Sequence, residues 1–251
     1  HYILPDFINN IYTKNKTCIT ILTSGIYETS LFNKLRDVIE ENKLIFKVAF
    51  LPSFKGVKIR ISSIDTNINI NTFYAFQKKI EGKISKYIFG YNKDRMEDVV
   101  GQMLLDNNLT LSVAESCTGG GLSEILTSIP GSSRFYKGGI VAYSNKIKIN
   151  ILDVKQRVID VNGAVSKEVA NAMSMAVQNK FKTDIGISIT GISGPSGGSK
   201  EKPTGLVYIS IYMKKKKLCE KFIFKTERNI HRKLTVSCSL NLLRKSLLKI
   251  N

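Results

Sequence analysis

The segment Thr110-Leu-Ser-Val-Ala-Glu-Ser-Cys-Thr-Gly-Gly-Gly121 decides the fold of the longer part of this chain. An apolar strand pattern ends at Glu115, a turn rich in glycine follows, and a helical pattern starts near Leu122. A strand that turns sharply into a helix exposes the residue at the turn, here Ser116, and points the free helix amides at whatever lies above it. The segment therefore predicts an α/β fold with a site at the carboxyl end of this strand.

The chain divides at a turn-rich run over residues 90–94. Residues 93–251 predict an α/β domain with a mixed sheet flanked by helices, and residues 1–92 predict a smaller α+β domain. In the larger domain we expect helices at 96–107, 119–129, 145–152, 166–182 and 227–249, and strands at 109–115, 139–143, 184–190, 205–213 and 218–225. In the smaller domain we expect strands at 18–22, 47–51 and 57–62, and helices at 28–41 and 73–89.

Composition and charge narrow the class of protein. The 251 residues carry 38 Lys and Arg against 20 Asp and Glu, a formal charge of +18. The lysines are spread along the chain, and the one dense run, 214–217, is typical of a hairpin turn, so a nucleic-acid partner is not expected. No apolar run approaches the ~20 residues that span a bilayer, which favours a cytoplasmic protein without membrane association. The chain opens on His1 instead of Met, which predicts a segment upstream.

The cysteines give no sign of a metal site or of disulfides. Cys18, Cys117, Cys219 and Cys238 lie far apart and form no C-x-x-C pair. The sequence shows no other cluster of metal-ligating residues. We therefore expect neither a metal nor a cofactor.

The turn after the strand has two interpretations. Ser116 can be a nucleophile in an elbow-like position, with Thr118 and the amides near Gly119 and Gly120 binding a phosphate or an oxyanion. Alternatively, Thr118 is only a helix cap and the glycines only form a tight turn. Cys117 is a second candidate nucleophile, because a thiolate is intrinsically the better one, but it needs a nearby imidazole or cation.

A serine nucleophile needs a base, and the sequence has only two histidines. His1 starts the chain, and His231 falls on the first turn of the last helix, where a surface or packing role is commoner, so a Ser-Lys pair is favoured over a Ser-His-Asp triad. The lysine must have a lowered pKa and therefore lie in a partly closed site. Lys148 follows the strand pattern 139–143 and meets this condition best, whereas Lys146 points elsewhere around the helix.

Two further segments carry candidate binding groups. The run from Thr190 to Gly205 is rich in Gly, Pro and hydroxyl residues and is long for a compact domain, which favours a functional loop over a disordered connector. Thr190, at the strand end, can hydrogen-bond into the site. Arg228 and Arg232 share a face of the last helix, where they either grip a phosphate or remain solvated.

Five segments together resemble the carboxy-terminal domain of the CinA (competence/damage-inducible) family. They are Ala114-Glu-Ser-Cys-Thr-Gly-Gly120, Pro130-Gly-Ser-Ser133, Gly138-Gly-Ile-Val-Ala-Tyr-Ser-Asn145, Gly163-Ala-Val-Ser166 and Thr190-Gly-Ile-Ser-Gly-Pro195. The resemblance implies an amidase that needs no metal and converts nicotinamide mononucleotide and water to nicotinic acid mononucleotide and ammonia. That reaction returns a pyridine nucleotide to NAD synthesis.

The resemblance also implies roles for single residues. It puts the family's Ser-Lys dyad on Ser116 and Lys148, its assisting tyrosine on Tyr143 and its strand-end hydroxyl on Thr190. The arginine of a G-D-R motif falls on Arg228, where this chain reads Thr-Glu-Arg. This departure keeps the arginine and alters the loop before it.

The first 95 residues are similar to the KH-like middle domain of longer CinA proteins, on Gly25-Ile-Tyr-Glu-Thr29 and Leu51-Pro-Ser-Phe-Lys-Gly-Val57. The sequence there has no G-x-x-G loop, so RNA binding is not implied. The molybdopterin-binding-like domain that precedes it in longer members has no counterpart in this sequence. The resemblance further implies a homodimer with a small nucleotide as substrate. The alternative to an amidase is a nucleic-acid or protein adaptor in competence or DNA repair.

Overall fold

The computed structural model describes residues 17–249, which form two compact units, one ending at Arg95 and the other beginning at Met96. The division expected from the sequence lay between residues 92 and 93. His1 lies outside the described residues. Among those that are described, no helix is both long and apolar enough to cross a membrane.

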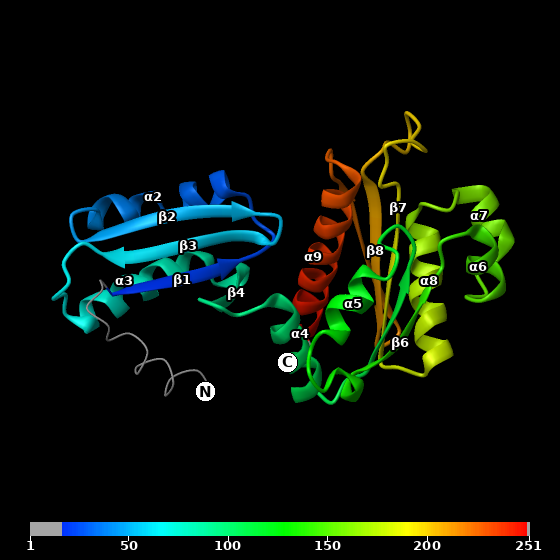
Figure 1. Ribbon diagram of the computed structural model, residues 1–251, viewed down its shortest axis with the longest axis horizontal. Coiled ribbons are helices and arrows are strands. Elements are labelled where there is room, and N and C mark those ends of the chain that lie inside the picture. The colour runs from blue at the N-terminus through cyan, green and yellow to red at the C-terminus, as the bar shows by residue number, and fades with distance from the viewer. Residues whose placement is uncertain (1–16, 250–251) are drawn as a thin grey trace. The chain divides into compact units, whose positions relative to one another are not determined.

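The smaller unit is a four-stranded antiparallel sheet with two helices packed on it (Figure 1). The strand order is β2-β3-β1-β4, and every neighbouring pair is antiparallel. Its elements are β1 (Cys18–Thr23), α2 (Glu28–Asn42), β2 (Phe46–Ser53), β3 (Gly56–Ser63), α3 (Ile70–Ile84) and β4 (Ile88–Tyr91).

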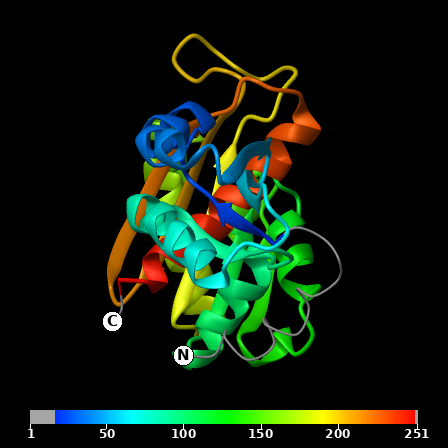
Figure 2. The same cartoon turned by 90° about the vertical axis from the view of Figure 1, so that its left-hand side faces the viewer.

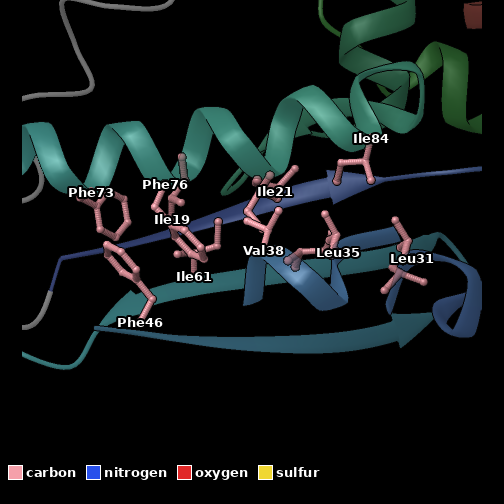
Figure 3. Packing of buried hydrophobic residues seen from close by; sticks show 13 residues of the cluster. Ile19, Ile21, Leu31, Leu35, Val38, Phe46, Ile61, Phe73, Phe76 and Ile84 are labelled. Carbon is pink, nitrogen blue, oxygen red and sulfur yellow. The ribbon is translucent and has the colours of Figure 1, made fainter. Parts of the chain in front are cut away.

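One apolar core joins the helices of this unit to its sheet (Figure 3). In β3, Val57, Ile59 and Ile61 are buried while the intervening Lys58 and Arg60 are exposed, as a strand with one buried face requires. The rings of Phe46 and Phe76 stack at 4.2 Å between centroids, so β2 and α3 hold each other directly.

The end of the smaller unit differs from the prediction. The helix expected over 73–89 ends at Ile84, and residues 88–91 form β4 beside β1. Ile88 and Phe89 fit a helical stripe as well as a strand, and the pairing with β1 joins residues far apart in sequence. Local periodicity does not contain that information.

The larger unit is a five-stranded mixed sheet in the order β6-β5-β7-β8-β9. Strands β6, β5 and β7 are parallel, whereas β8 and β9 run antiparallel to their neighbours. Its strands are β5 (Leu111–Glu115), β6 (Tyr136–Val141), β7 (Ile185–Gly191), β8 (Leu206–Met213) and β9 (Lys216–Ile223). Its helices are α4 (Met96–Asp106), α5 (Gly121–Thr127), α6 (Asn145–Asn150), α7 (Gln156–Asn162), α8 (Lys167–Phe181) and α9 (Arg228–Leu247).

Helices cover both faces of this sheet, which confirms the predicted fold class (Figure 1). Helix α8 packs across all five strands on one face, with α7 beside it. Helices α5 and α9 lie against the other face, and α4 packs on α9. The loop 192–205 extends beyond the carboxyl end of β7 and is visible in yellow at the top of Figure 2.

Two local features of this unit differ from the prediction, and one agrees with it. Helix α7 was not expected, because its seven residues are too few to show a clear helical period. Strand β6 starts at Tyr136, before the expected 139, because a bulge at Lys137 lets Tyr136 pair with Leu111 ahead of the regular register that begins at Gly138. The lysine run does form a hairpin turn, and Lys214 and Lys215 occupy it with φ of 50° and 61°.

Strand β7 and helix α8 are so close that position 186 has no room for a side chain. A Cβ on Gly186 would lie 2.0 Å from the carbonyl oxygen of Ser174 and 3.1 Å from the amide nitrogen of Gln178. Gly186→Ala is therefore expected to lower the free energy of unfolding of the larger unit by about 1–3 kcal/mol, because backbone atoms must move apart. Urea denaturation followed by circular dichroism measures the change.

Gly82 in α3 provides the contrast, because a Cβ there would meet no atom within 4 Å. Gly82→Ala is expected to leave stability unchanged or to raise it by up to about 1 kcal/mol, as alanine favours a helix. Equal stability of Gly186→Ala and the wild type would contradict the close approach of β7 and α8.

Candidate active site

Ser116 lies at the carboxyl end of the central parallel strands. All five residues of β5 are buried, and Ser116 follows them with 7% of its surface exposed. Its amide donates to the carbonyl of Ile189 at 3.0 Å, while the amide of Ala142 donates to the carbonyl of Glu115 at 2.7 Å. Main-chain hydrogen bonds therefore hold the position of Ser116 from both neighbouring strands, as the strand–turn–helix pattern predicts.

Lys148 lies within hydrogen-bonding distance of Ser116. The hydroxyl of Ser144 caps α6 by accepting from the amide of Ile147 at 3.3 Å, and the helix carries Lys148 back towards the sheet. The Lys148 Nζ is 3.2 Å from Ser116 Oγ and donates to the carbonyl of Ala142 at 2.8 Å. Lys148 is 2% exposed, whereas Lys146 is exposed. Of the two candidate bases, the structure brings only Lys148 to the serine.

The two groups nearest Ser116 have pKa values that move in opposite directions. Burial lowers the pKa of Lys148 from its ordinary 10.5, which increases the neutral fraction of the amine. Burial raises the pKa of the Cys117 thiol to about 11. The lysine is therefore suited to accept a proton, while the thiol remains protonated near neutral pH.

Tyr143 and Arg228 are brought together at the rim of the site. Tyr143 follows the end of β6, is 63% exposed, and accepts a hydrogen bond from Arg228 Nη2 at 3.0 Å. Arg228 Nη1 donates to the carbonyl of Gly194 at 2.9 Å, which ties the first residue of α9 to the loop 192–205. Within residues 17–249, the Tyr143 hydroxyl makes no hydrogen bond to Ser116 or Lys148.

The amides expected to hold an anion already have acceptors. The amide of Gly120 donates to Glu115 Oε2 at 3.1 Å, and that of Gly119 to the carbonyl of Ser116 at 3.1 Å. The Glu115 carboxylate also accepts from the amides of Leu122 at 3.0 Å and Ser123 at 2.8 Å. The expected anion contact through Gly119 and Gly120 does not fit this arrangement, because a side chain of the protein occupies the helix N-terminus.

The remaining hydrogen-bond donors of the turn belong to Cys117 and Thr118, the two residues after Ser116. In the part of the chain that the structure describes, the amides of Cys117 and Thr118 have no carbonyl or carboxylate acceptor. The Thr118 hydroxyl is fully buried and also has no hydrogen-bond partner there. Arg232 donates to the Thr118 carbonyl through Nε at 3.3 Å and Nη2 at 2.7 Å, so it anchors the turn.

The strand register places Thr190 beside Ser116, but the Thr190 hydroxyl bonds to another part of the chain. Glu115 pairs with Ile189 in the parallel ladder, so the residues that follow them, Ser116 and Thr190, fall on the same face of the sheet. The Thr190 hydroxyl donates to the carbonyl of Ala164 at 2.8 Å. The structure therefore gives Thr190 a bond to the segment before α8, where a bond into the site was expected.

His231 fixes the loop 192–205 from within the fold. It is fully buried, with Nδ1 3.0 Å from the Ser193 hydroxyl and Nε2 3.1 Å from the Gly205 carbonyl. A carbonyl can only accept, so Nε2 carries the proton and Nδ1 accepts from Ser193. Burial and the charge of Arg228 lower the pKa of His231, which favours this neutral form. The packing role inferred from the sequence agrees with this geometry.

Sequence reasoning missed two residues of this neighbourhood, Glu115 and Ser193. Glu115 immediately precedes the candidate nucleophile, and a charged residue at the end of an otherwise uncharged, mainly apolar strand was the available signal. Ser193 had no signal beyond its place in a loop rich in hydroxyls. Across residues 17–249, no three His, Cys, Asp or Glu side chains are grouped so as to hold a metal ion.

Comparisons with known proteins cover both units. Residues 93–247 match the family model described as the CinA C-terminal domain, and residues 20–90 match the one described as the damage-inducible protein CinA KH domain. A CinA-like protein of Cytophaga hutchinsonii is 37% identical over 92% of this chain and 56% of its own length. One of Trichodesmium erythraeum is 40% identical over 89% of this chain and 53% of its own length. The chain thus spans about half the length of these curated relatives.

A solved structure from the same family is also similar to this chain. A crystal structure of a competence-damaged protein (CinA) superfamily protein from Escherichia coli is similar to this chain with a TM-score of 0.59 and 30% sequence identity. The similarity covers 60% of this chain and 88% of that one.

The lowered pKa of Lys148 predicts a pH-dependent stability. The unfolded chain binds more protons than the folded one between the folded pKa of Lys148 and its ordinary 10.5, so the free energy of unfolding rises with pH across that window. Lys148→Met removes this contribution. The stability of the variant relative to wild type is therefore expected to be highest below the folded pKa of Lys148 and to decrease towards pH 10.5. Urea denaturation of both proteins across that range measures the difference.

Lys146→Met is the matched control, because Lys146 lies on the same helix with its side chain exposed. Its stability relative to wild type is expected to stay constant over the same pH range. A constant difference for Lys148→Met would show that the folded protein does not lower the pKa of Lys148.

Proposed function

The chain belongs to the CinA family, and on this premise we propose that it is an amidohydrolase that converts nicotinamide mononucleotide and water to nicotinic acid mononucleotide and ammonia. The observation that carries the proposal is the 3.2 Å distance between Lys148 Nζ and Ser116 Oγ, with both side chains buried. A serine hydroxyl in contact with a lysine of lowered pKa is suited to acyl transfer. The choice of substrate rests on the amidase activity that the family resemblance implies.

Acylation follows from the contacts of Lys148. A neutral amine can donate one N–H to the Ala142 carbonyl while its lone pair faces the Ser116 hydroxyl. Lys148 takes the serine proton as Oγ attacks the carboxamide carbon, and then returns it to the nitrogen that leaves as ammonia. Water attacks the resulting ester with Lys148 again as base, which releases the carboxylate and restores Ser116.

The oxyanion of this reaction needs donors that are not already used. The amides of Cys117 and Thr118 donate to no carbonyl or carboxylate among the described residues, whereas those of Gly119 and Gly120 donate to Ser116 and Glu115. The amide of the residue after a nucleophile is the usual first donor of such a site. We assign oxyanion stabilisation to Cys117 and Thr118, where preorganised amides lower the barrier without rearrangement.

Arg228 is the proposed contact for the substrate phosphate. It is exposed, and its two terminal nitrogens already orient it between Tyr143 and the loop 192–205. A guanidinium held in this way retains further N–H groups for a phosphate oxygen. Tyr143 would then line the same side of the site as Arg228.

The central test measures ammonia and nicotinic acid mononucleotide from purified protein and nicotinamide mononucleotide. Ser116→Ala and Lys148→Ala are each expected to lower kcat by at least about 10³-fold, because the nucleophile and its base act as a unit. The kcat of the wild type is expected to rise with pH as Lys148 loses its proton, with the rising limb below 10.5.

Two neighbouring variants are controls for this assay. Cys117→Ala is expected to retain turnover because the thiol is protonated, and Lys146→Ala because its side chain is exposed. Loss of turnover in Cys117→Ala with retention in Ser116→Ala would transfer the nucleophile to the cysteine. Turnover by wild type no faster than by the two dyad variants would reject the proposed activity.

A substitution at Thr118 tests whether its hydroxyl contributes to substrate binding. Its hydroxyl is buried without a partner, which costs about 1–3 kcal/mol unless a ligand supplies one. Thr118→Val is expected to leave the free energy of unfolding unchanged or higher while lowering kcat/KM by about 3- to 10-fold, the value of one hydrogen bond. Chemical denaturation and steady-state kinetics measure the two effects.

Thr183 is the matched control, because its buried hydroxyl bonds to Ser112 at 2.8 Å and to the Ile185 carbonyl at 3.0 Å. Thr183→Val is expected to destabilise the protein without changing kcat/KM. A stability loss in Thr118→Val with unchanged kcat/KM would assign its hydroxyl to the fold alone.

A further inference from the structure

Glu115 is the residue immediately before the nucleophile, and its carboxylate is 1% exposed. Oε2 accepts from the amides of Gly120 at 3.1 Å and Leu122 at 3.0 Å. Oε1 accepts from the amide and the hydroxyl of Ser123, both at 2.8 Å. One side chain at the end of β5 therefore receives four hydrogen bonds from the first residues of α5 and the glycine before it.

These bonds close the turn that contains Ser116 into a small ring. At one end, the sheet holds the main chain through the Glu115 carbonyl, which accepts from Ala142, and the Ser116 amide, which donates to Ile189. At the other end, the Glu115 side chain holds Gly120 and the start of α5. The four residues between these ends, 116–119, have little freedom to move. They include the nucleophile and the two amides assigned to the oxyanion.

The hydrogen bonds around Ser123 require a carboxylate at position 115. The Ser123 hydroxyl accepts from the Tyr136 hydroxyl at 2.8 Å, so its own proton is directed to Glu115 Oε1. The Ser123 amide points at the same oxygen. A glutamine with its carbonyl oxygen kept on Gly120 and Leu122 would place its NH₂ group against two donors.

We propose that Glu115 is a positioning residue for the hydrolase reaction: its carboxylate fixes the turn so that Ser116 faces Lys148 and the Cys117 and Thr118 amides face the reacting carbonyl. This inference rests on the proposed function. Glu115 does not touch the substrate. It acts by keeping the nucleophile and the oxyanion donors in one geometry, and misplacement of such groups by about 1 Å lowers rates on the order of 10²-fold.

The test compares Glu115→Gln with Glu124→Gln, which removes the same charge from an exposed position of α5, the helix that Glu115 holds. In the nicotinamide mononucleotide assay, Glu115→Gln is expected to lower kcat by about 10²-fold with KM unchanged, because the lost geometry matters in the transition state. The pH at which kcat rises is expected to stay where it is in wild type. Glu124→Gln is expected to match the wild type in kcat, KM and pH profile.

A second measurement is independent of turnover. Among the backbone amides of Gly120, Leu122 and Ser123, hydrogen exchange is expected to accelerate in Glu115→Gln, most of all at Ser123, whose acceptor oxygen becomes an NH₂ group when the glutamine oxygen stays on Gly120 and Leu122. Exchange at all three amides is expected to stay slow in Glu124→Gln, which leaves both oxygens of Glu115 in place. Thermal unfolding of both variants measures the folded fraction, and kcat is expressed per folded protein.

The outcomes separate the two proposals. Wild-type kcat in Glu115→Gln, or a reduced kcat with a shifted pH profile, would overturn the positioning role. If wild type does not hydrolyse nicotinamide mononucleotide, the proposed function fails, and the exchange measurement alone then decides whether Glu115 holds the turn. Unchanged exchange at those three amides would overturn the inference in either case.

Discussion

The parallel pairing of β5 with a strand on each side is the constraint from which the rest of the site follows. It brings three carboxyl ends to one edge of the sheet, and the ladder continues past the strands through Ala142 and Ser116. Those two residues are then adjacent although they are far apart in sequence. The buried amine of Lys148 reaches both residues, because it contacts the hydroxyl of Ser116 and the carbonyl of Ala142. The contact between Ser116 and Lys148 is therefore a consequence of the sheet topology.

The loop 192–205 and helix α9 add side chains at the same edge of the sheet. They contribute cations and hydroxyls, but the structure uses several of these groups to hold the loop itself or the turn after Ser116. Arg232 bonds to the Thr118 carbonyl, Arg228 to Gly194, and His231 to both ends of the loop. These cations therefore serve partly as a scaffold, and the formal charge of +18 overstates the number of groups that are free to bind an anion.

Most of the fold could be predicted from the sequence, because the larger domain contains strong periodic patterns between glycine-rich turns. The errors occurred where the determinant was not local. Strand β4 depends on pairing with β1, and the start of β6 depends on a bulge opposite β5. For the site, Ser116 and Lys148 were predictable from a turn, a shortage of histidine and a family resemblance. The acceptors of Gly120 and Thr190 were not, because hydrogen bonds from these groups are decided by which residue the fold places opposite them.

The hydrogen bonds of Glu115 also bear on selectivity between solutes. A helix N-terminus beside a reactive serine is ordinarily open to small inorganic anions, which are abundant in any cell. Here a tethered carboxylate fills that position, and unlike a dissolved ion it cannot be exchanged or outcompeted. For the proposed hydrolase, this carboxylate would limit inhibition by simple salts at this end of the helix. Recognition of the proposed substrate would then depend on its larger organic shape, which a free anion does not possess.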